Sequence, residues 1–221
     1  MKITVFEEIF SPSIYSSILI TAILSIVIII FGLRIRKLKP TDPPKGMLMF
    51  LEMTVDFING FCRENFGKYW KFYAPYILTL GLFLVVSNTS GLFGLRPPTA
   101  SVSVTAALAI ITFLLIHISG IMTKGVKEYA KGFLEPIAFM LPLNIIGEFA
   151  IPIALSLRLF GNIFSGLIIT GLVYGVLGNY AVIVTPALHG IFDLFFGIIQ
   201  AIVFVLLSTI FISGQLDLEE N

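Results

Sequence analysis

Charged side chains are scarce in this chain. Asp, Glu, Lys and Arg make up 12% of its 221 residues, whereas 57% are hydrophobic. A soluble domain usually has about twice that charged fraction. The net charge of +1 gives no indication of nucleic-acid binding. The one cysteine, Cys62, excludes an internal disulfide and a cysteine-rich metal site. The composition therefore points to a membrane protein.

Two further signals are missing from the sequence. The N-terminus, MKITVFEE, lacks the layout of a signal peptide, and no small-residue cleavage site follows the first apolar run. No phosphate-binding loop of the form GxxxxGK followed by Ser or Thr occurs. We therefore expect no ATP chemistry by the chain itself, and no cofactor.

Long apolar runs are what the sequence has in abundance. Runs of 18 or more residues predict an all-α integral membrane protein, with residues 1–221 forming a single polytopic domain. The predicted transmembrane helices are 14–33, 69–86, 102–121, 141–176 and 181–212. The fourth is long enough that it must be tilted or partly interfacial. It forms a long hairpin with the fifth.

The segments between the spans have their own patterns. Residues 45–65 alternate polar and apolar side chains at helical spacing, with Met49, Met53 and Phe57 on one stripe. This predicts an amphipathic helix that lies on the membrane surface or against a partner. Residues 124–131, KGVKEYAK, are expected to form a basic loop.

Lysine and arginine are distributed unevenly. Residues 34–71 carry eight of them and residues 124–131 carry three, whereas the opposite side has only Lys2 and Arg96. Cytoplasmic loops carry the excess of positive charge in membrane proteins. We therefore expect the amphipathic helix and the C-terminus in the cytoplasm and the N-terminus outside.

Arg158 stands in the middle of the fourth span, within SLRLFGN (156–162). A cation at this depth costs roughly 2.5–3.5 kcal/mol on insertion scales, and guanidinium cannot lose its proton in a cell. Such a residue is retained when a carboxylate must meet it in the bilayer. The alternative is an arginine that snorkels or is neutralised within its own chain.

Other polar side chains lie on either side of Arg158. Asn162 is one turn outward and Glu148 lies about 15 Å inward. His189, Asp193 and Gln200, in the fifth span, are spaced four and seven residues apart, which predicts one helical face. If Gln200 is level with Arg158, Asp193 lies about 10 Å and His189 about 16 Å outward.

The ionisable groups then form an inner and an outer set with a fixed positive charge between them. This pattern favours two half-paths that do not meet over one continuous pore. Each polar residue also has a structural alternative. His189 could simply form a hydrogen bond with Asp193. Gln200 and Asn162 could form hydrogen bonds that join helices. Glu148 and His117 could lie at solvated helix ends.

The chain resembles subunit a of the rotary F-type ATP synthase, bacterial type. The resemblance rests on SLRLFGN (156–162), on IQAIVF (199–204) and on PTASVSVT (98–105). It implies a non-catalytic subunit of the bacterial cell membrane whose tilted hairpin faces a ring of subunit c. It also implies subunit b of the peripheral stalk and membrane lipid as partners.

The resemblance implies a stator with two offset half-channels, in which Arg158 is the essential arginine with Asn162 and Gln200 beside it. Many members of the family carry an acid or histidine at the position of Leu167, and many carry a histidine or glutamate at the position of Asp193. Some members carry an aspartate at the position of Ser101. Because of these departures, the resemblance does not decide which residues relay protons in the outer half-channel. The sequence does not distinguish H⁺ from Na⁺ as the coupling ion.

Two other classes of protein fit parts of the pattern. In a secondary transporter for a small anion, Arg158 would be the counter-ion of the substrate. Such a protein would show paired repeats, and the sequence has no internal repeat. An assembly or scaffold protein would have no reason to keep Arg158 and Asp193 in the bilayer.

Overall fold

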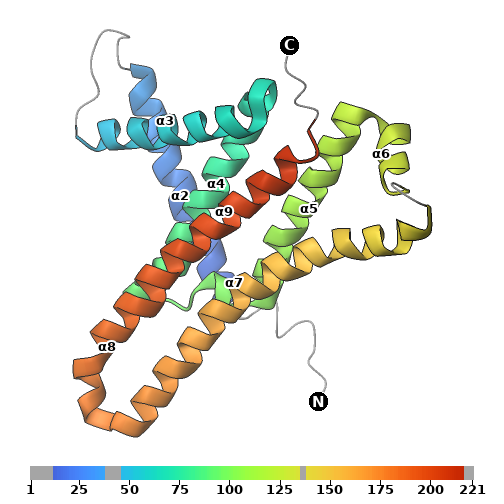
Figure 1. The fold of residues 1–221 in the computed structure, drawn as a ribbon. Helices are drawn as coiled ribbons and strands as arrows, with labels where there is room; N and C mark the ends of the chain where they lie inside the picture. The colour runs from blue at the N-terminus through green and yellow to red at the C-terminus, as the bar shows by residue number, and fades with distance from the viewer. Residues whose placement is uncertain (1–11, 38–45, 135–137, 217–221) are drawn as a thin grey trace.

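The structure is a computed structural model that describes residues 12–37, 46–134 and 138–216. All regular structure in these residues is helical (Figure 1). The long helices are α2 (Pro12–Lys37), α3 (Met47–Phe66), α4 (Trp70–Thr89), α5 (Val102–Lys124), α7 (Leu141–Leu177) and α9 (Gly197–Ser213). Between α7 and α9 lie the short α8 (Ala181–His189) and a π-helix (Gly190–Phe196).

Five stretches of the described residues are long and apolar enough to cross a membrane. They are Ser13–Ile35, Met47–Phe93, Val102–Lys124, Leu141–Leu177 and Pro186–Ser213. Apolar side chains are exposed along all of them, as expected for surfaces that meet lipid. The prediction of an all-α membrane protein with five spans is therefore confirmed.

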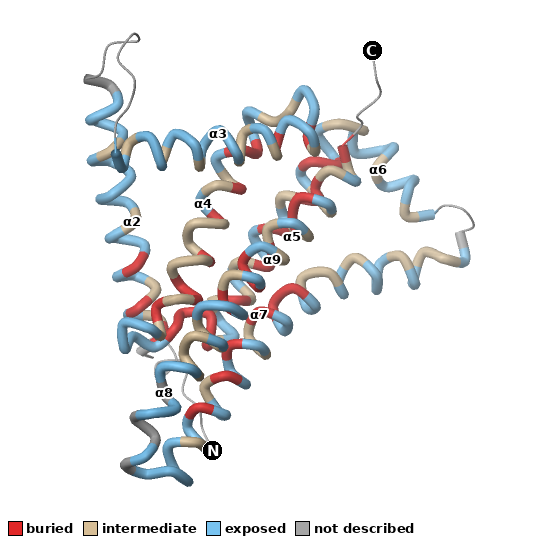
Figure 2. Tube along the Cα trace, turned by 60° about the vertical axis from the view of Figure 1, so that its left-hand side comes forward, coloured by how far each residue is buried: buried red, intermediate tan, exposed pale blue. Residues whose placement is uncertain are grey.

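The buried side chains gather where α4, α5, α7 and α9 meet (Figure 2). Hydroxyl groups join these helices: Tyr73 donates to Ser119 at 2.6 Å, and Thr105 and Ser156 lie 3.1 Å apart. In lipid, where apolar burial does not drive helices together, such contacts and close packing hold a bundle. The bundle is the frame against which the hairpin of α7 and α9 rests.

Helix α3 crosses the end of α4 instead of continuing it (Figure 1). Its charged residues are exposed, whereas Cys62 and Phe66 are buried against Tyr73 and Ile212. The turn between the helices is made at Gly67, whose φ of 50° is readily adopted only by glycine. The burial of Cys62 removes it as an accessible thiol on this helix.

Two expectations for the chain path are wrong. Residues 126–132 form a helix, α6 (Val126–Gly132), where we expected a basic loop. Gly125, at a φ of 78°, ends α5 and lets the chain start a new helix in another direction. The fifth span is not one α-helix, because the π-helix Gly190–Phe196 interrupts it. Residue 45, the predicted start of the amphipathic helix, lies outside the described residues.

Candidate functional site

The site is built on the antiparallel hairpin of α7 and α8–α9, whose tip is at residues 178–180 and whose base is at Leu141 and Ser213. The side-chain amide of Asn162 donates to Gln200 Oε1 at 2.8 Å and joins the two arms. The bond brings the side chain of Gln200 to that of Asn162, which lies one helical turn, about 6 Å, along α7 from Arg158.

Arg158 lies on the exposed side of α7, although it stands in the middle of an apolar span. Within the described ranges the one ion pair is His189–Asp193, so Arg158 has no carboxylate partner there. An unpaired cation at membrane depth is unfavourable unless a partner comes from outside the chain. The exposed guanidinium is thus able to meet a carboxylate from outside the chain.

A cavity of about 470 Å³ lies between Arg158 and the hairpin tip, and we call it the tip-side cavity. Asp193 and His189 line it from one arm and Leu167 from the other, with Arg96 and Gly91 from the segment after α4. The structure thus brings Leu167 and Asp193 to the same cavity.

A chain of hydrogen bonds starts at Asp193 and His189, which line the tip-side cavity, and continues to Tyr174. Asp193 Oδ2 lies 2.5 Å from His189 Nδ1, and His189 Nε2 lies 3.0 Å from the hydroxyl of Tyr174. The first bond confirms that His189 and Asp193 are neighbours one turn apart. Tyr174 was not expected from the sequence, since a tyrosine near a helix end usually reads as an interfacial aromatic residue.

Asp193 is packed closely against the chain that follows α4. A Cβ atom on Gly91 would collide with the Asp193 carboxylate, so the glycine makes room for the acid. Asp193 also lies within the π-helix, a feature common at functional sites.

The π-helix ends where a buried asparagine contacts its backbone. Asn88 donates its amide to the carbonyl oxygen of Gly197 at 2.9 Å and accepts from the Thr99 hydroxyl at 2.8 Å. Asn88 and Thr99 are fully buried. In the polar sequence SNTS (87–90), an asparagine of a turn and a buried asparagine such as Asn88 look alike, so the sequence alone does not reveal this contact.

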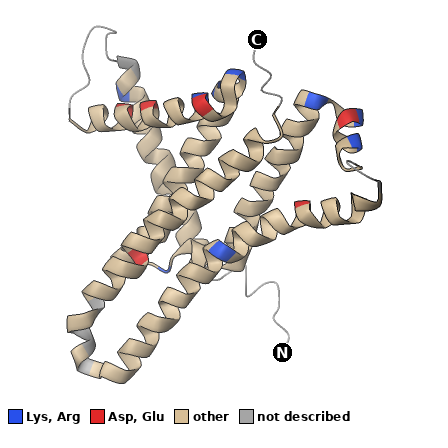
Figure 3. Cartoon of the chain, in the orientation of Figure 1, with Lys and Arg blue, Asp and Glu red and all other residues tan. Residues whose placement is uncertain are grey.

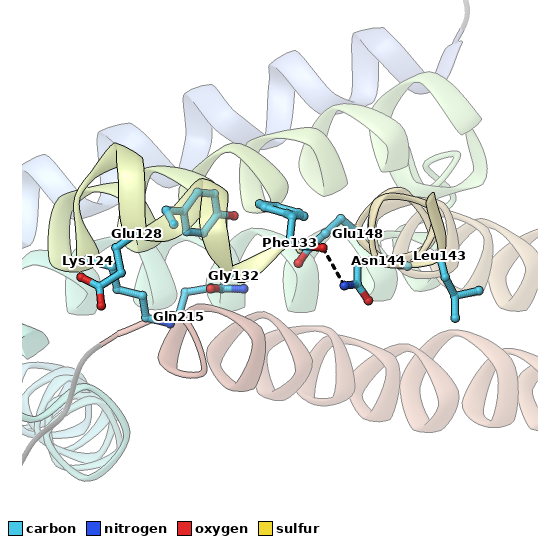
Figure 4. Close-up of a pocket in the computed structure, with 10 residues that line it drawn as sticks. Lys124, Glu128, Gly132, Phe133, Leu143, Asn144, Glu148 and Gln215 are labelled. Carbon is cyan, nitrogen blue, oxygen red and sulfur yellow. Dashed lines mark hydrogen bonds between the residues drawn. The ribbon is translucent and has the colours of Figure 1, made fainter. Parts of the chain in front are cut away.

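A second cavity, of about 450 Å³, lies on the other side of Arg158, and we call it the base-side cavity. Glu148 lines it from α7, about 15 Å along the helix from Arg158. Lys124, Glu128 and Gln215 also face it (Figure 4). Asn144 Nδ2 donates to the Phe133 carbonyl oxygen at 2.9 Å and closes one wall.

The structure thus joins Asn162 to Gln200 and His189 to Asp193, and keeps Glu148 apart from all four. Metal binding is not indicated in the described part of the chain, where no cluster of three metal-ligating side chains occurs. The fold and the site define a class: a polytopic helical membrane protein with ionisable groups on both sides of an unpaired arginine.

Comparison with known proteins identifies the family. Residues 15–213 match the family model described as ATP synthase A chain. The chain belongs to this family, ATP synthase subunit a, the ion-translocating stator subunit of the Fo membrane sector. It is thus a multi-pass membrane protein and a component of the ATP synthase complex.

The similar proteins come from several bacteria. ATP synthase subunit a of Moorella thermoacetica is 34% identical over 202 residues, covering 91% of this chain and 90% of that protein. Its counterpart in Streptococcus agalactiae is 36% identical over 219 residues, covering 93% and 92%. The "ATP synthase subunit a, sodium ion specific" of Propionigenium modestum is 36% identical over 190 residues, and the chain spans 64% of its length.

Proposed function

We propose that the chain provides two offset half-channels for protons, separated by Arg158, and that these couple proton flow to rotation of a ring of subunit c. The observation that carries the proposal is the pair of cavities on opposite sides of Arg158. One contains Asp193 and His189, and the other contains Glu148.

The tip-side cavity is the outer half-channel in this proposal. Most lysines and arginines lie around α3 and α6, at the other end of the molecule (Figure 3). The positive-inside rule then assigns the α3 end to the cytoplasm and the hairpin tip to the outside. The N-terminus is outside and the C-terminus in the cytoplasm of a bacterial cell.

The mechanism follows from the charges. A proton enters by way of His189 and Asp193, passes the Asn162–Gln200 pair and neutralises a carboxylate on the ring. A neutral carboxyl can face lipid, whereas an ionised one cannot without a large desolvation penalty. After nearly a full turn the carboxyl meets the half-channel of Glu148 and releases its proton to the cytoplasm.

Arg158 keeps the two half-channels separate in this proposal. Its fixed charge favours the ionised form of an approaching ring carboxyl, which promotes proton release and prevents a direct leak between the half-channels. Each proton that crosses gains roughly 2.3 kcal/mol per 100 mV of membrane potential. The chain itself is non-catalytic, and its partners are the ring, subunit b of the peripheral stalk and lipid.

Replacing the arginine tests the proposal. Arg158→Ala should abolish ATP-driven proton pumping in inverted membrane vesicles, while the detached catalytic head still hydrolyses ATP. Arg34→Ala, at the exposed end of α2, is the matched control and should pump normally. Assays with and without added Na⁺ distinguish proton from sodium coupling. Normal pumping by Arg158→Ala would refute the assignment.

A further inference from the structure

Tyr174 is the outermost of three side chains that hydrogen bonds join near the tip of the hairpin. Its hydroxyl, on α7, lies 3.0 Å from His189 Nε2, at the end of α8, and His189 Nδ1 lies 2.5 Å from Asp193 Oδ2. Tyr174 is exposed, whereas the side chains of His189 and Asp193 are 28% and 14% exposed. Exposure therefore falls along the chain from the phenol to the acid. The proton path proposed above runs through His189 and Asp193 and gives Tyr174 no role.

The protonation state of Asp193 decides which ring nitrogen of His189 carries the proton. An ionised carboxylate only accepts hydrogen bonds, so a neutral His189 then donates from Nδ1. Its Nε2 atom is left as an acceptor, and the Tyr174 hydroxyl donates to it. A protonated Asp193 instead donates to Nδ1, and His189 carries its proton on Nε2. The Tyr174 oxygen then accepts from Nε2.

A hydroxyl suits both states of His189, because it rotates and can either donate or accept. A cation such as Arg96, which lines the same cavity, could only donate to Nε2, and a carboxylate could only accept from it. Either group would favour one tautomer of the imidazole over the other. The hydroxyl of Tyr174 is a partner for Nε2 before and after Asp193 changes its protonation state.

We propose that Tyr174 is a positioning residue of the outer half-channel: its hydroxyl holds the His189 ring against Asp193 in both tautomers. Water supplies a proton to Nε2, and the imidazolium passes its Nδ1 proton to the Asp193 carboxylate. After Asp193 has passed that proton on, the ring gives its Nε2 proton to water and takes up another at Nδ1. These steps run backwards when the complex pumps. The inference rests on the proposed place of His189 and Asp193 in the outer half-channel.

Removal of the hydroxyl tests the inference, because Tyr174→Phe keeps the aromatic ring. In inverted membrane vesicles that carry the assembled complex, we expect ATP-driven pumping to fall roughly three- to tenfold, which corresponds to one lost hydrogen bond. Each pumping rate is divided by the rate of uncoupled ATP hydrolysis in the same vesicles. Tyr180→Phe, the same change at an exposed position of the hairpin tip, is the matched control and should pump at the wild-type rate.

A second background separates positioning from packing. His189→Gln leaves a side-chain amide near Asp193 but no ring to orient, so adding Tyr174→Phe to it should cause no further loss. If Tyr174 only packed against its neighbours, the same loss would occur in both backgrounds.

The ratio of the pumping rates in H₂O and D₂O is an independent readout, and it decides the matter if His189→Gln pumps too slowly for the comparison. The ratio should rise in Tyr174→Phe, because proton transfer through a poorly oriented ring then limits the rate. It should keep the wild-type value in Tyr180→Phe.

Three results would overturn the inference. One is wild-type pumping by Tyr174→Phe, another is an equal loss in the His189→Gln background, and the third is an unchanged isotope ratio. If pumping still requires Arg158 in these cases, the proposed function stands and only the role of Tyr174 falls. Normal pumping by Arg158→Ala would instead remove the proposed function itself.

Discussion

Asp193 and Leu167 line one cavity from opposite arms of the hairpin, and we therefore expect an acid to work at either position. Asp193→Asn should impair proton entry, because a neutral amide cannot exchange a proton near neutral pH. The asparagine oxygen can still accept from His189 Nδ1, so the geometry is retained while proton exchange is lost. A positioned proton-transfer group contributes typically 10²–10⁴-fold. Because water in a cavity of about 470 Å³ can bridge part of the gap, we expect a loss of roughly 10–100-fold.

Adding Leu167→Glu to this variant should restore part of the pumping. Leu167 is only partly buried and faces the cavity, so a glutamate there meets Arg96 and His189 and not lipid alone. The matched control is Leu172→Glu, which is on the same helix at a position 63% exposed and outside the residues that line the cavity. In the control we expect poor assembly, because the new charge faces lipid.

The assay is ATP-driven pumping per assembled complex in inverted vesicles, with the complex quantified by its co-purifying ring. The double variant Asp193→Asn, Leu167→Glu should pump several-fold faster than Asp193→Asn. Wild-type pumping by Asp193→Asn would show that the proton does not pass this acid. A double variant that assembles but pumps no faster would show that the two positions do not share a path.

Two further predictions follow from the packing. Gly91→Ala should displace the Asp193 carboxylate and lower pumping several-fold in assembled complexes. Gly171→Ala, where an added Cβ meets no neighbouring atom, is the control and should pump at the wild-type rate. Equal pumping by both variants would refute the role of the close contact between Gly91 and Asp193. Cys62 should react slowly with an impermeant thiol reagent because it is buried. Glu52→Cys, at an exposed position of the same helix, should react quickly when the reagent is added on the cytoplasmic side. Labelling of Glu52→Cys only from outside would show that the orientation of the protein in the membrane is inverted.

The helices and the polar residues could be predicted from the sequence because their signals are local. An apolar run long enough to span a bilayer predicts a helix whatever surrounds it, and a charged residue such as Arg158 within it is evident from the chain alone. The spacing of four between His189 and Asp193 likewise places them one turn apart. These features do not depend on how the helices pack.

The relative positions of the helices could not be predicted. Gln200 pairs with Asn162, because tilt and packing between α7 and α9 decide which side chains meet. The π-helix around Asp193 is followed directly by Gly197, whose carbonyl oxygen accepts a hydrogen bond from Asn88 of α4, far away in the sequence. Changes from i+4 to i+5 bonding leave no mark in an apolar sequence. The segment 126–132 was missed since a charged heptapeptide suits a loop and a short exposed helix equally.

The arrangement of the hairpin bears on why a second subunit is needed. The Asn162 amide donates to Gln200 Oε1 and not to a group on Arg158, and the buried Gln200 Nε2 has no partner among the described residues, so neither amide is bonded to the guanidinium. Arg158 thus keeps its charge uncompensated within the described part of the chain, on an exposed face between two cavities. An internal carboxylate partner would lower the cost of burial, but it would also cancel the field that acts on an approaching carboxyl. The unpaired arginine therefore supports a role in which Arg158 acts on a carboxylate of a partner subunit. The insertion cost of the arginine, roughly 2.5–3.5 kcal/mol, is then offset when the partner's carboxylate approaches it.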